Sequence, residues 1–456
     1  MRIHFIAIGG SAMHNLAIAL HKKGYKVTGS DDAVFEPSAS RLARYGLLPD
    51  KNGWDTKRIN TDLDAVILGM HALKDNPELL RAQELGLKIY SYPEYIYEQT
   101  KDKLRVVIGG SHGKTTITSM ILHVLNHYKY DFDYLVGAQL TGFDTMVKIT
   151  ASASLIVIEG DEYLASPIDR RPKFHLYKAN IGVISGIAWD HINVFPTYED
   201  YIRQFKIFID TIEPGGKLIY CNADTDLNAM VAKSSASVEK IGYNILDHTV
   251  SNGVTYLMPQ KTPLQIFGDH NLMNLNAARL VCEQLGIAVT QFDIAISSFT
   301  GAAKRLELLY TKNKTNVYKD FAHSPSKLKA TIEAVKNQFT DRRLIACIEL
   351  HTFSSLNKIF LQQYANTMTK ANIAIVYIDE HTFEQKKMIP LTENDVRTAF
   401  NGPEILFFNN SSLLENYLIN INFYAANLLL MSSGNFGELD LMKLARELNT
   451  VSNEEL

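Results

Sequence analysis

Apolar runs of strand length alternate with helical patterns along most of the 456 residues. The first run, Ile3–Ile8, is typical of a buried strand, and the turn Gly9–Ser11 leads from it into a helical segment that ends at Gly24. A second strand (YKVTGSDD) follows directly. This order predicts a parallel sheet with a right-handed crossover. Strands from Ala65 and Lys88 complete a small α/β unit, which we end at residue 103.

A second alternation of the same kind begins at Arg105. A strand, a glycine turn and a helix reaching about His127 precede strands over Leu155–Glu159 and Ile181–Ser185. The pattern is less regular over residues 218–267, and a third α/β alternation runs from about residue 301 to the end. The hydrophobic pattern therefore predicts an α/β protein built from three units.

Composition is that of a globular chain rather than a disordered or fibrous one, because 46% of the residues are apolar and 21% are charged. The net charge of −3 comes without a basic block, which argues against a nucleic-acid surface. Cys221, Cys282 and Cys347 form no CxxC pair, so neither a disulfide framework nor a thiolate metal site is indicated. With no apolar run of membrane-spanning length and no signal-peptide pattern, we predict a cytoplasmic protein.

The strongest chemical signal is GGSHGKTT, Gly109–Thr116. A strand, a glycine turn and a helix start gather backbone N–H groups around one anion. Lys114 is placed to reach the β- and γ-phosphates of a nucleotide, and the hydroxyl of Thr115 is a typical Mg²⁺ ligand. Position 108 holds Ile where the standard spacing has glycine, so this is a shortened P-loop. The alternative is a glycine-rich turn with an unrelated lysine.

Two further positions belong to the same unit. Glu159 closes an apolar strand and is followed by Asp161 and Glu162; a carboxylate at the tip of a parallel strand near a P-loop is a candidate Mg²⁺ ligand. The alternative is an acidic, solvated turn. His191, in WDHINVF, follows another strand. A lone histidine is more often structural, but its combination with GKTT and Glu159 favours a functional role.

Weaker signals lie in the outer units. The turn IGGSAMHN is similar to a dinucleotide-binding turn, with His14 in place of the third glycine, and Asp31 and Asp32 are candidates to accept a ribose hydroxyl. In KDFAHSP, Asp320 and His323 come just after a strand. A plain structural turn and an ordinary βα-loop are the respective alternatives.

The segments GGSHGKTT, IEGDEY, WDH, GDHNLMNLNAA, KRLE and DFAHSP occur in this order over nearly the whole chain, and together they resemble the Mur ligase family. The resemblance implies an ATP-dependent enzyme that forms amide bonds in peptidoglycan synthesis or recycling. It also implies three domains: an N-terminal Rossmann-like domain for a UDP-sugar (1–103), a central P-loop ATPase with a mainly parallel sheet (104–300), and a C-terminal Rossmann-like domain for the amine donor (301–456).

The segments IGGSAMHNLA and TGSDD are similar to those of family members that act on UDP-N-acetylmuramate. One kind of member adds L-alanine in biosynthesis. The other adds L-alanyl-γ-D-glutamyl-meso-diaminopimelate in recycling. EGDEYLASPIDRRPKF, from Glu159, and MSSGNFGEL, from Met431, resemble the peptide ligases, whereas ELHTFSSLN, from Glu349, resembles the alanine ligases. We therefore expect a peptide ligase, with the L-alanine ligase as the alternative.

The resemblance implies roles for single residues. Lys114, Glu159 and His191 would be catalytic, and Thr115, Glu159 and His191 would surround Mg²⁺. The expected ATP-binding residues are Gly110, Ser111, His112, Gly113, Lys114, Thr115, Thr116, His270, Asn271, Asn274, Arg305 and Asp320. The residues expected to bind the other substrates are Gly9, Gly10, Ser11, Ala12, Ser30, Asp31 and His323.

Three positions stand apart from this pattern. Ser324 replaces a second histidine and His14 replaces a glycine, while Lys206 lies where some relatives carry a carbamylated lysine. The expected partners are small molecules: UDP-N-acetylmuramate, ATP and an amino acid or peptide. A nicotinamide dehydrogenase would leave GKTT unexplained, and a P-loop switch acting on a protein partner is the other competing class.

Overall fold

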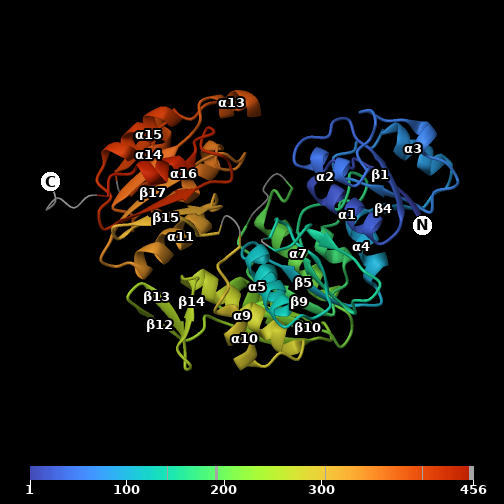
Figure 1. Cartoon of the computed structure of the whole chain (residues 1–456), viewed down its shortest axis with the longest axis horizontal. Coiled ribbons are helices and arrows are strands. Elements are labelled where there is room, and N and C mark those ends of the chain that lie inside the picture. Colours follow the sequence, from blue (N-terminus) through green and yellow to red (C-terminus); the bar gives the residue numbers. More distant parts are fainter. Residues whose placement is uncertain (141, 190–193, 303–304, 403, 451–456) are drawn as a thin grey trace. The chain divides into compact units, whose positions relative to one another are not determined.

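The computed structural model describes residues 1–140, 142–189, 194–302, 305–402 and 404–450. The chain divides into two compact units (Figure 1): residues 1–244 with 273–296, and residues 245–272 with 297–456. Helices alternate with mainly parallel strands, which confirms the predicted fold class. The domain boundaries at residues 103 and 300 stay a prediction.

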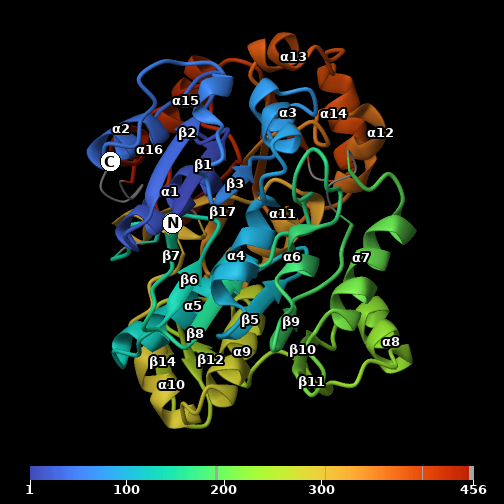
Figure 2. The ribbon, with the colours of Figure 1, turned by 90° about the vertical axis from the view of Figure 1, so that its right-hand side faces the viewer.

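The N-terminal sheet of the first unit is parallel throughout, with the order β2-β1-β3-β4. Helix α1 covers one face of this sheet and α3 covers the other (Figure 2). Because β1 is an inner strand, the glycine turn after it lies at the carboxyl edge, where ligands of such sheets bind. The elements are β1 (Arg2–Ile6), α1 (Ser11–Lys22), β2 (Lys26–Ser30), α2 (Ser38–Arg44), β3 (Ala65–Leu68), α3 (Pro77–Glu84), β4 (Ile89–Ser91) and α4 (Tyr92–Thr100).

The second sheet of this unit has the order β11-β10-β9-β5-β8-β6-β7 and is parallel except for the β6–β7 pair. Ile108 of β5 pairs with Glu159 of β8 and with Val183 of β9, so the carboxyl ends of three strands meet at the P-loop. The elements are β5 (Leu104–Gly109), α5 (Lys114–His127), β6 (Asp133–Leu135), β7 (Val147–Lys148), β8 (Leu155–Glu159), α6 (Lys173–Leu176), β9 (Ile181–Ile184), α7 (Tyr198–Asp210), β10 (Lys217–Cys221), α8 (Thr225–Lys233), β11 (Glu239–Tyr243) and α10 (Val289–Ile296).

The second unit combines a small antiparallel sheet, β12-β13-β14, with a six-stranded sheet of order β15-β16-β20-β17-β18-β19, in which only the β15–β16 pair is antiparallel. Successive residues of β17 enter different core clusters, with Ala346 on one side of the sheet and Cys347 on the other. The elements are β12 (His248–Ser251), β13 (Val254–Leu257), β14 (Thr262–Leu264), β15 (Glu307–Lys312), β16 (Thr315–Asp320), α11 (Pro325–Gln338), β17 (Arg343–Glu349), α12 (Lys358–Leu361), β18 (Ile373–Tyr377), α13 (His381–Lys386), α14 (Glu393–Phe400), β19 (Ile405–Phe408), α15 (Ser411–Asn420), β20 (Ala426–Met431) and α16 (Leu441–Glu447).

The predicted elements agree best where the apolar run is continuous. The strand Leu155–Glu159 has its predicted bounds, and the helix expected over residues 271–285 is α9 (Asp269–Gln284). All three cysteines are buried and free. Within the described ranges, the structure has no helix that is both long and apolar enough to cross a membrane.

Candidate active site

The P-loop joins the end of β5 to the start of α5 at Lys114. Gly110 and Gly113 have φ angles of 127° and 78°, in the region that favours glycine. A Cβ on Gly110 would lie 2.7 Å from the backbone nitrogen of Ser185, and one on Gly113 would collide with the side-chain amide of Asn274. Both glycines are therefore required by backbone conformation and by close packing. Asn274, predicted beside the nucleotide, does lie against the loop.

Lys114 is held at the loop by two acceptors. Its Nζ donates to the carbonyl oxygen of Gly110 (2.6 Å) and to Oε2 of Glu162 (2.6 Å). Burial alone would lower the pKa of Lys114, but the carboxylates of Glu162 and Asp161 outweigh burial and raise it. The ammonium therefore stays charged at neutral pH, as phosphate binding requires.

Glu159 and Thr115 lie side by side at the tips of β8 and α5. The Thr115 hydroxyl donates to Oε1 of Glu159 (2.7 Å), and the backbone N–H of Gly137 donates to Oε2 (2.7 Å). Burial raises the pKa of Glu159 although these hydrogen bonds oppose the shift. A hydroxyl and a carboxylate are oxygen ligands of the kind Mg²⁺ prefers, and a cation would relieve the cost of an ionised Glu159.

The third predicted metal ligand, His191, lies outside the described residues. Within the part of the chain that is described, no group of three His, Cys, Asp or Glu side chains is arranged to hold a metal ion. Lys206, the position at which some relatives carry a carbamylated lysine, is exposed on α7. The pair Thr115–Glu159 is thus the part of the predicted metal site that the structure brings together.

The acidic run after β8 is not a solvated turn. Asp161 accepts a hydrogen bond from Nζ of Lys173 (2.6 Å), and Glu162 is fully buried. Burial would raise the pKa of Asp161, but Lys173 and Lys114 lower it overall. The run therefore supplies three carboxylates with three different partners. Sequence reasoning found the run but missed the Lys114–Glu162 pair, which spans 48 positions.

The remaining loop residues fix the P-loop to the end of β9. The Ser111 hydroxyl donates to the carbonyl oxygen of Gly186 (3.1 Å), and the Ser185 hydroxyl donates to the carbonyl oxygen of His112. Thr116 is buried within α5. These contacts hold the loop in one conformation, which reduces the reorganisation needed to bind an anion.

The N-terminal glycine turn is organised around Asp31. The backbone N–H of Gly9 donates to Oδ2 of Asp31 (2.7 Å). Burial, together with the neighbouring Asp32 carboxylate, raises the pKa of Asp31 to about 6. Gly10 is the N-cap of α1, and Ser11 and Ala12 after it are exposed. Ser11 and Ala12 are therefore accessible to a ligand, whereas Asp31 is buried behind the turn.

Two residues near this turn face inward. Ser30 is fully buried and its hydroxyl donates to Oε1 of Glu78 (2.7 Å), so this hydroxyl does not face a ligand. His14 is buried as well, with Nδ1 3.0 Å from the carbonyl oxygen of Gly10 and 3.0 Å from Oγ of Ser38, and burial lowers its pKa. The fold accommodates the departure from glycine at position 14 by placing the imidazole in the core.

In the second unit, Asp320 organises two loop ends. Its Oδ2 accepts from the backbone N–H of Leu306 (2.7 Å) and its Oδ1 from that of Ala322 (2.7 Å). Asp320 is buried, so the carboxylate connects the entry to β15 with the loop after β16. A role in ATP binding stays a prediction for this residue.

Arg305 and His323 both contact Phe321, at the carboxyl edge of the C-terminal sheet. The Arg305 guanidinium lies 4.7 Å from the centre of the Phe321 ring, and Nδ1 of His323 lies 2.8 Å from the Phe321 carbonyl oxygen. On α9, the Asn271 side chain donates to the carbonyl oxygen of Phe267 (2.9 Å). The structure thus gathers Arg305, Asp320 and His323 around one loop.

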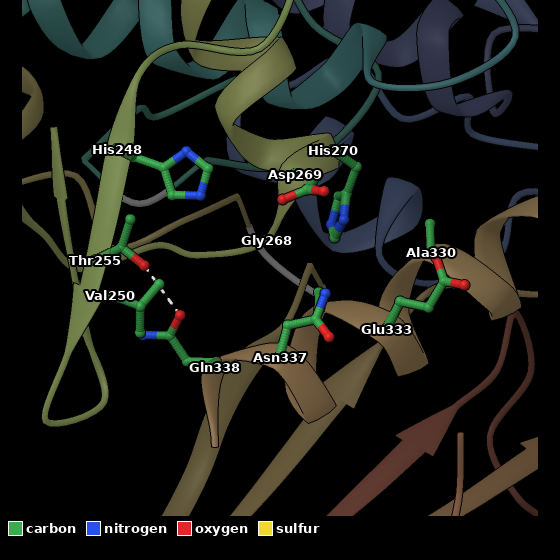
Figure 3. A pocket seen from close by; sticks show the side chains of 11 residues that line it. His248, Val250, Thr255, Gly268, Asp269, His270, Ala330, Glu333, Asn337 and Gln338 are labelled. Carbon is green, nitrogen blue, oxygen red and sulfur yellow. Dashed lines mark hydrogen bonds between the residues drawn. The ribbon is translucent and has the colours of Figure 1, made fainter. Parts of the chain in front are cut away.

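His270 lines a small pocket between β12, β13 and α11 (Figure 3). His248, Asp269, Glu333 and Asn337 also line it, and its volume is about 170 Å³. Ligand pockets usually exceed about 300 Å³, so this cavity is too small for a nucleotide. Among the predicted site residues it includes only His270.

Comparison with known proteins now identifies the family. A model of the Mur ligase family, catalytic domain, matches residues 2–103, and a model of the Mur ligase middle domain matches residues 108–282. A UDP-N-acetylmuramate–L-alanine ligase from Caldicellulosiruptor bescii is 32% identical over 409 residues, covering 85% of this chain and 86% of that protein. The chain belongs to the Mur ligase family. Mur ligases form carbon–nitrogen bonds with ATP and Mg²⁺, which confirms the predicted enzyme class and cofactors.

Solved structures share the fold of this Mur ligase. A murein peptide ligase from Psychrobacter arcticus has a TM-score of 0.63 and 23% identity, covering 99% of each chain. A UDP-N-acetylmuramate–alanine ligase from Thermotoga maritima has a TM-score of 0.68 and 18% identity, covering 98% of this chain and 97% of that one. At these identities the similarity shows the fold alone. The roles expected for single residues of this Mur ligase stay predictions.

Proposed function

We propose that this Mur ligase joins the carboxylate of UDP-N-acetylmuramate to an amine donor through an acyl phosphate. The observation that carries the proposal is the P-loop arrangement, in which the charged Lys114 and the Thr115–Glu159 pair lie at the meeting strand ends. The N-terminal glycine turn of the same unit, with Ser11 and Ala12 exposed and Asp31 bonded to Gly9 behind them, supports an acceptor site for the UDP-sugar. The name of the C. bescii relative supports this acceptor.

The chemistry follows from the weakness of a carboxylate as an electrophile. The γ-phosphoryl group of ATP is transferred to a carboxylate oxygen, and ADP leaves. The amine then attacks the acyl carbon, loses a proton, and expels inorganic phosphate. Both steps place negative charge on oxygens, which Lys114 and the loop N–H groups are positioned to stabilise. Bound Mg²⁺ would supply further charge neutralisation, held by Thr115 and Glu159.

For the amine donor we propose L-alanine. Curated relatives that cover most of the chain, including one from Sulfurihydrogenibium that is 28% identical and covers 96% of both proteins, are named as L-alanine ligases. Two segments, beginning at Glu159 and Met431, predict a peptide donor, but these comparisons favour the L-alanine ligase, which is the alternative. The tripeptide L-alanyl-γ-D-glutamyl-meso-diaminopimelate is the second candidate because of those two segments. A cytoplasmic location belongs to the same proposal.

Phosphate release should distinguish the two donors. With UDP-N-acetylmuramate and ATP present, we expect L-alanine alone to support turnover, with kcat/KM at least about 100-fold above that for the tripeptide, since sites built for one polar substrate discriminate strongly. Reactions without the UDP-sugar serve as the control. Turnover with the tripeptide but not with L-alanine would make the enzyme a peptide ligase. Release independent of either donor would contradict the ligase reaction itself.

Acceptor binding should depend on pH through Asp31. Its pKa is about 6, so the carboxylate that would accept a ribose hydroxyl is lost as the pH falls through 6. We expect the KM for UDP-N-acetylmuramate to rise about 4-fold between pH 7.5 and 5.5, because only about a quarter of the Asp31 carboxylates are ionised at the lower pH. Asp31→Asn should have a raised KM at both pH values and no such dependence. A variant that keeps the wild-type pH profile would show that another group titrates.

A further inference from the structure

A set of polar side chains is fully buried beneath the N-terminal glycine turn. Glu78, in the first turn of α3, and His4, on β1, have no exposed surface. Oε1 of Glu78 accepts from the Ser30 hydroxyl (2.7 Å) and from the backbone N–H of Asp55 (2.8 Å), and Oε2 lies 3.2 Å from Nε2 of His4. The Glu78 carboxylate of α3 therefore makes polar contacts with β1, with β2 and with the loop before residue 56.

Ser30 connects this carboxylate to the turn. Its carbonyl oxygen accepts from the backbone N–H groups of Ala7 (2.9 Å) and Ile8 (3.1 Å), the two residues directly before the glycine turn. Its hydroxyl also accepts from the Arg58 guanidinium (2.9 Å). The next residue, Asp31, receives the N–H of Gly9. A displacement of Ser30 would therefore move both sides of the predicted acceptor site.

Glu78 is a charged side chain in a position where an apolar side chain would cost less free energy to bury. Burial would raise the pKa of Glu78, but the hydrogen bonds from His4, Asp55 and Ser30 outweigh burial and lower it, so the carboxylate is ionised. A buried, hydrogen-bonded carboxylate is often no more stabilising than well-packed apolar side chains of similar volume. What its hydrogen bonds do provide is a fixed arrangement of the groups that they join. Here they fix the position of Ser30 and, through it, that of the neighbouring Asp31.

We propose that Glu78 is a positioning residue for the acceptor site, which acts through Ser30 to hold the Asp31 carboxylate and the glycine turn bonded to it in the geometry that receives the UDP-sugar. The inference rests on the proposed function. Because Glu78 has no exposed surface, it contacts no ligand itself. Its effect should fall on acceptor binding and spare the ATP site.

Glu78→Gln tests this with little change of shape. We expect the KM for UDP-N-acetylmuramate to rise at least about fivefold, as for other coupled buried pairs, while kcat and the KM for ATP stay within about twofold. Glu84→Gln is the matched control: it lies on the same helix, α3, where Glu84 is exposed and paired with Arg81 (2.6 Å). It should leave all three constants unchanged.

Ser30→Ala provides a second route if Glu78→Gln folds poorly. It removes the link and leaves Glu78 beside His4, and it should raise the same KM. In the double variant the two effects should not add, because both break one connection. A lower melting temperature in either variant without a selective rise in that KM would overturn the inference. If the wild type itself shows no turnover with UDP-N-acetylmuramate, the proposed function falls, and the inference falls with it.

Discussion

Replacing Lys114 by methionine is expected to lower the rate of ATP-driven amide formation by about 10³-fold, the loss typical of removing one preorganised group that stabilises developing charge. The ammonium is held at the P-loop by Gly110 and Glu162, and its pKa is raised, so it is charged before ATP arrives. Methionine keeps much of the side-chain volume and removes the charge. Phosphate release under saturating ATP, Mg²⁺, UDP-N-acetylmuramate and L-alanine measures the effect.

The same substitution should also lower stability, because it deprives the buried Glu162 of the Lys114 ammonium. Adding Glu162→Gln should recover much of the melting temperature and none of the activity, which separates the two roles. Lys101→Met is the matched control, since Lys101 is exposed and pairs with the half-buried Glu98 at the protein surface. Normal turnover by the Lys114→Met, Glu162→Gln double variant would show that Lys114 takes no part in the reaction.

Replacing Glu159 by glutamine is expected to lower kcat by about 10²-fold or more, since it removes a charged ligand from the predicted magnesium site. The free energy of unfolding of the metal-free protein, by contrast, should rise in this variant. The folded-state pKa of Glu159 is raised by burial, so its ionised form costs free energy in the metal-free protein. That cost is absent below the unfolded-state pKa. It grows as the pH rises from the unfolded-state pKa to the folded-state pKa, and it is fully present above the folded-state pKa.

Melting curves over a pH series test this sign. Without metal, Glu159→Gln should melt at or above the wild-type temperature at pH 7.5, and the difference should shrink toward pH 4. Mg²⁺ with ATP should stabilise the wild type more than the variant. Glu84→Gln again serves as the exposed control. A variant that retains wild-type activity and the wild-type response to Mg²⁺ would contradict the assignment of Glu159 as a ligand.

The parts of the fold and site that could be predicted are those encoded locally. The strand over Leu155–Glu159 is a continuous apolar run, and the P-loop is a short motif whose glycines have conformations that favour glycine. The Lys114–Glu162 pair joins positions distant in sequence, so no local pattern indicates it, and the proximity of Asn274 to Gly113 is indicated only by the family resemblance.

The N-terminal site shows a signal that could have been used. Ser30 and Asp31 are neighbours at the end of a strand, and successive side chains of a strand point to opposite faces. Only one of the two could face a ligand, and the structure places Ser30 inward against Glu78 while Asp31 meets the glycine turn. Glu78 itself gives no such signal, because it reads as an ordinary acidic residue in the first turn of a helix.

The three buried thiols provide an internal measure of local opening. Cys221 and Cys282 belong to the first compact unit and Cys347 to the second, and burial raises the pKa of each, so none reacts readily in the closed state. Under native conditions, the labelling rate of each cysteine by a thiol reagent therefore reports the opening free energy of its own surroundings. Ligand protection of Cys347 compared with Cys221 would show which unit each substrate stabilises, without any added probe.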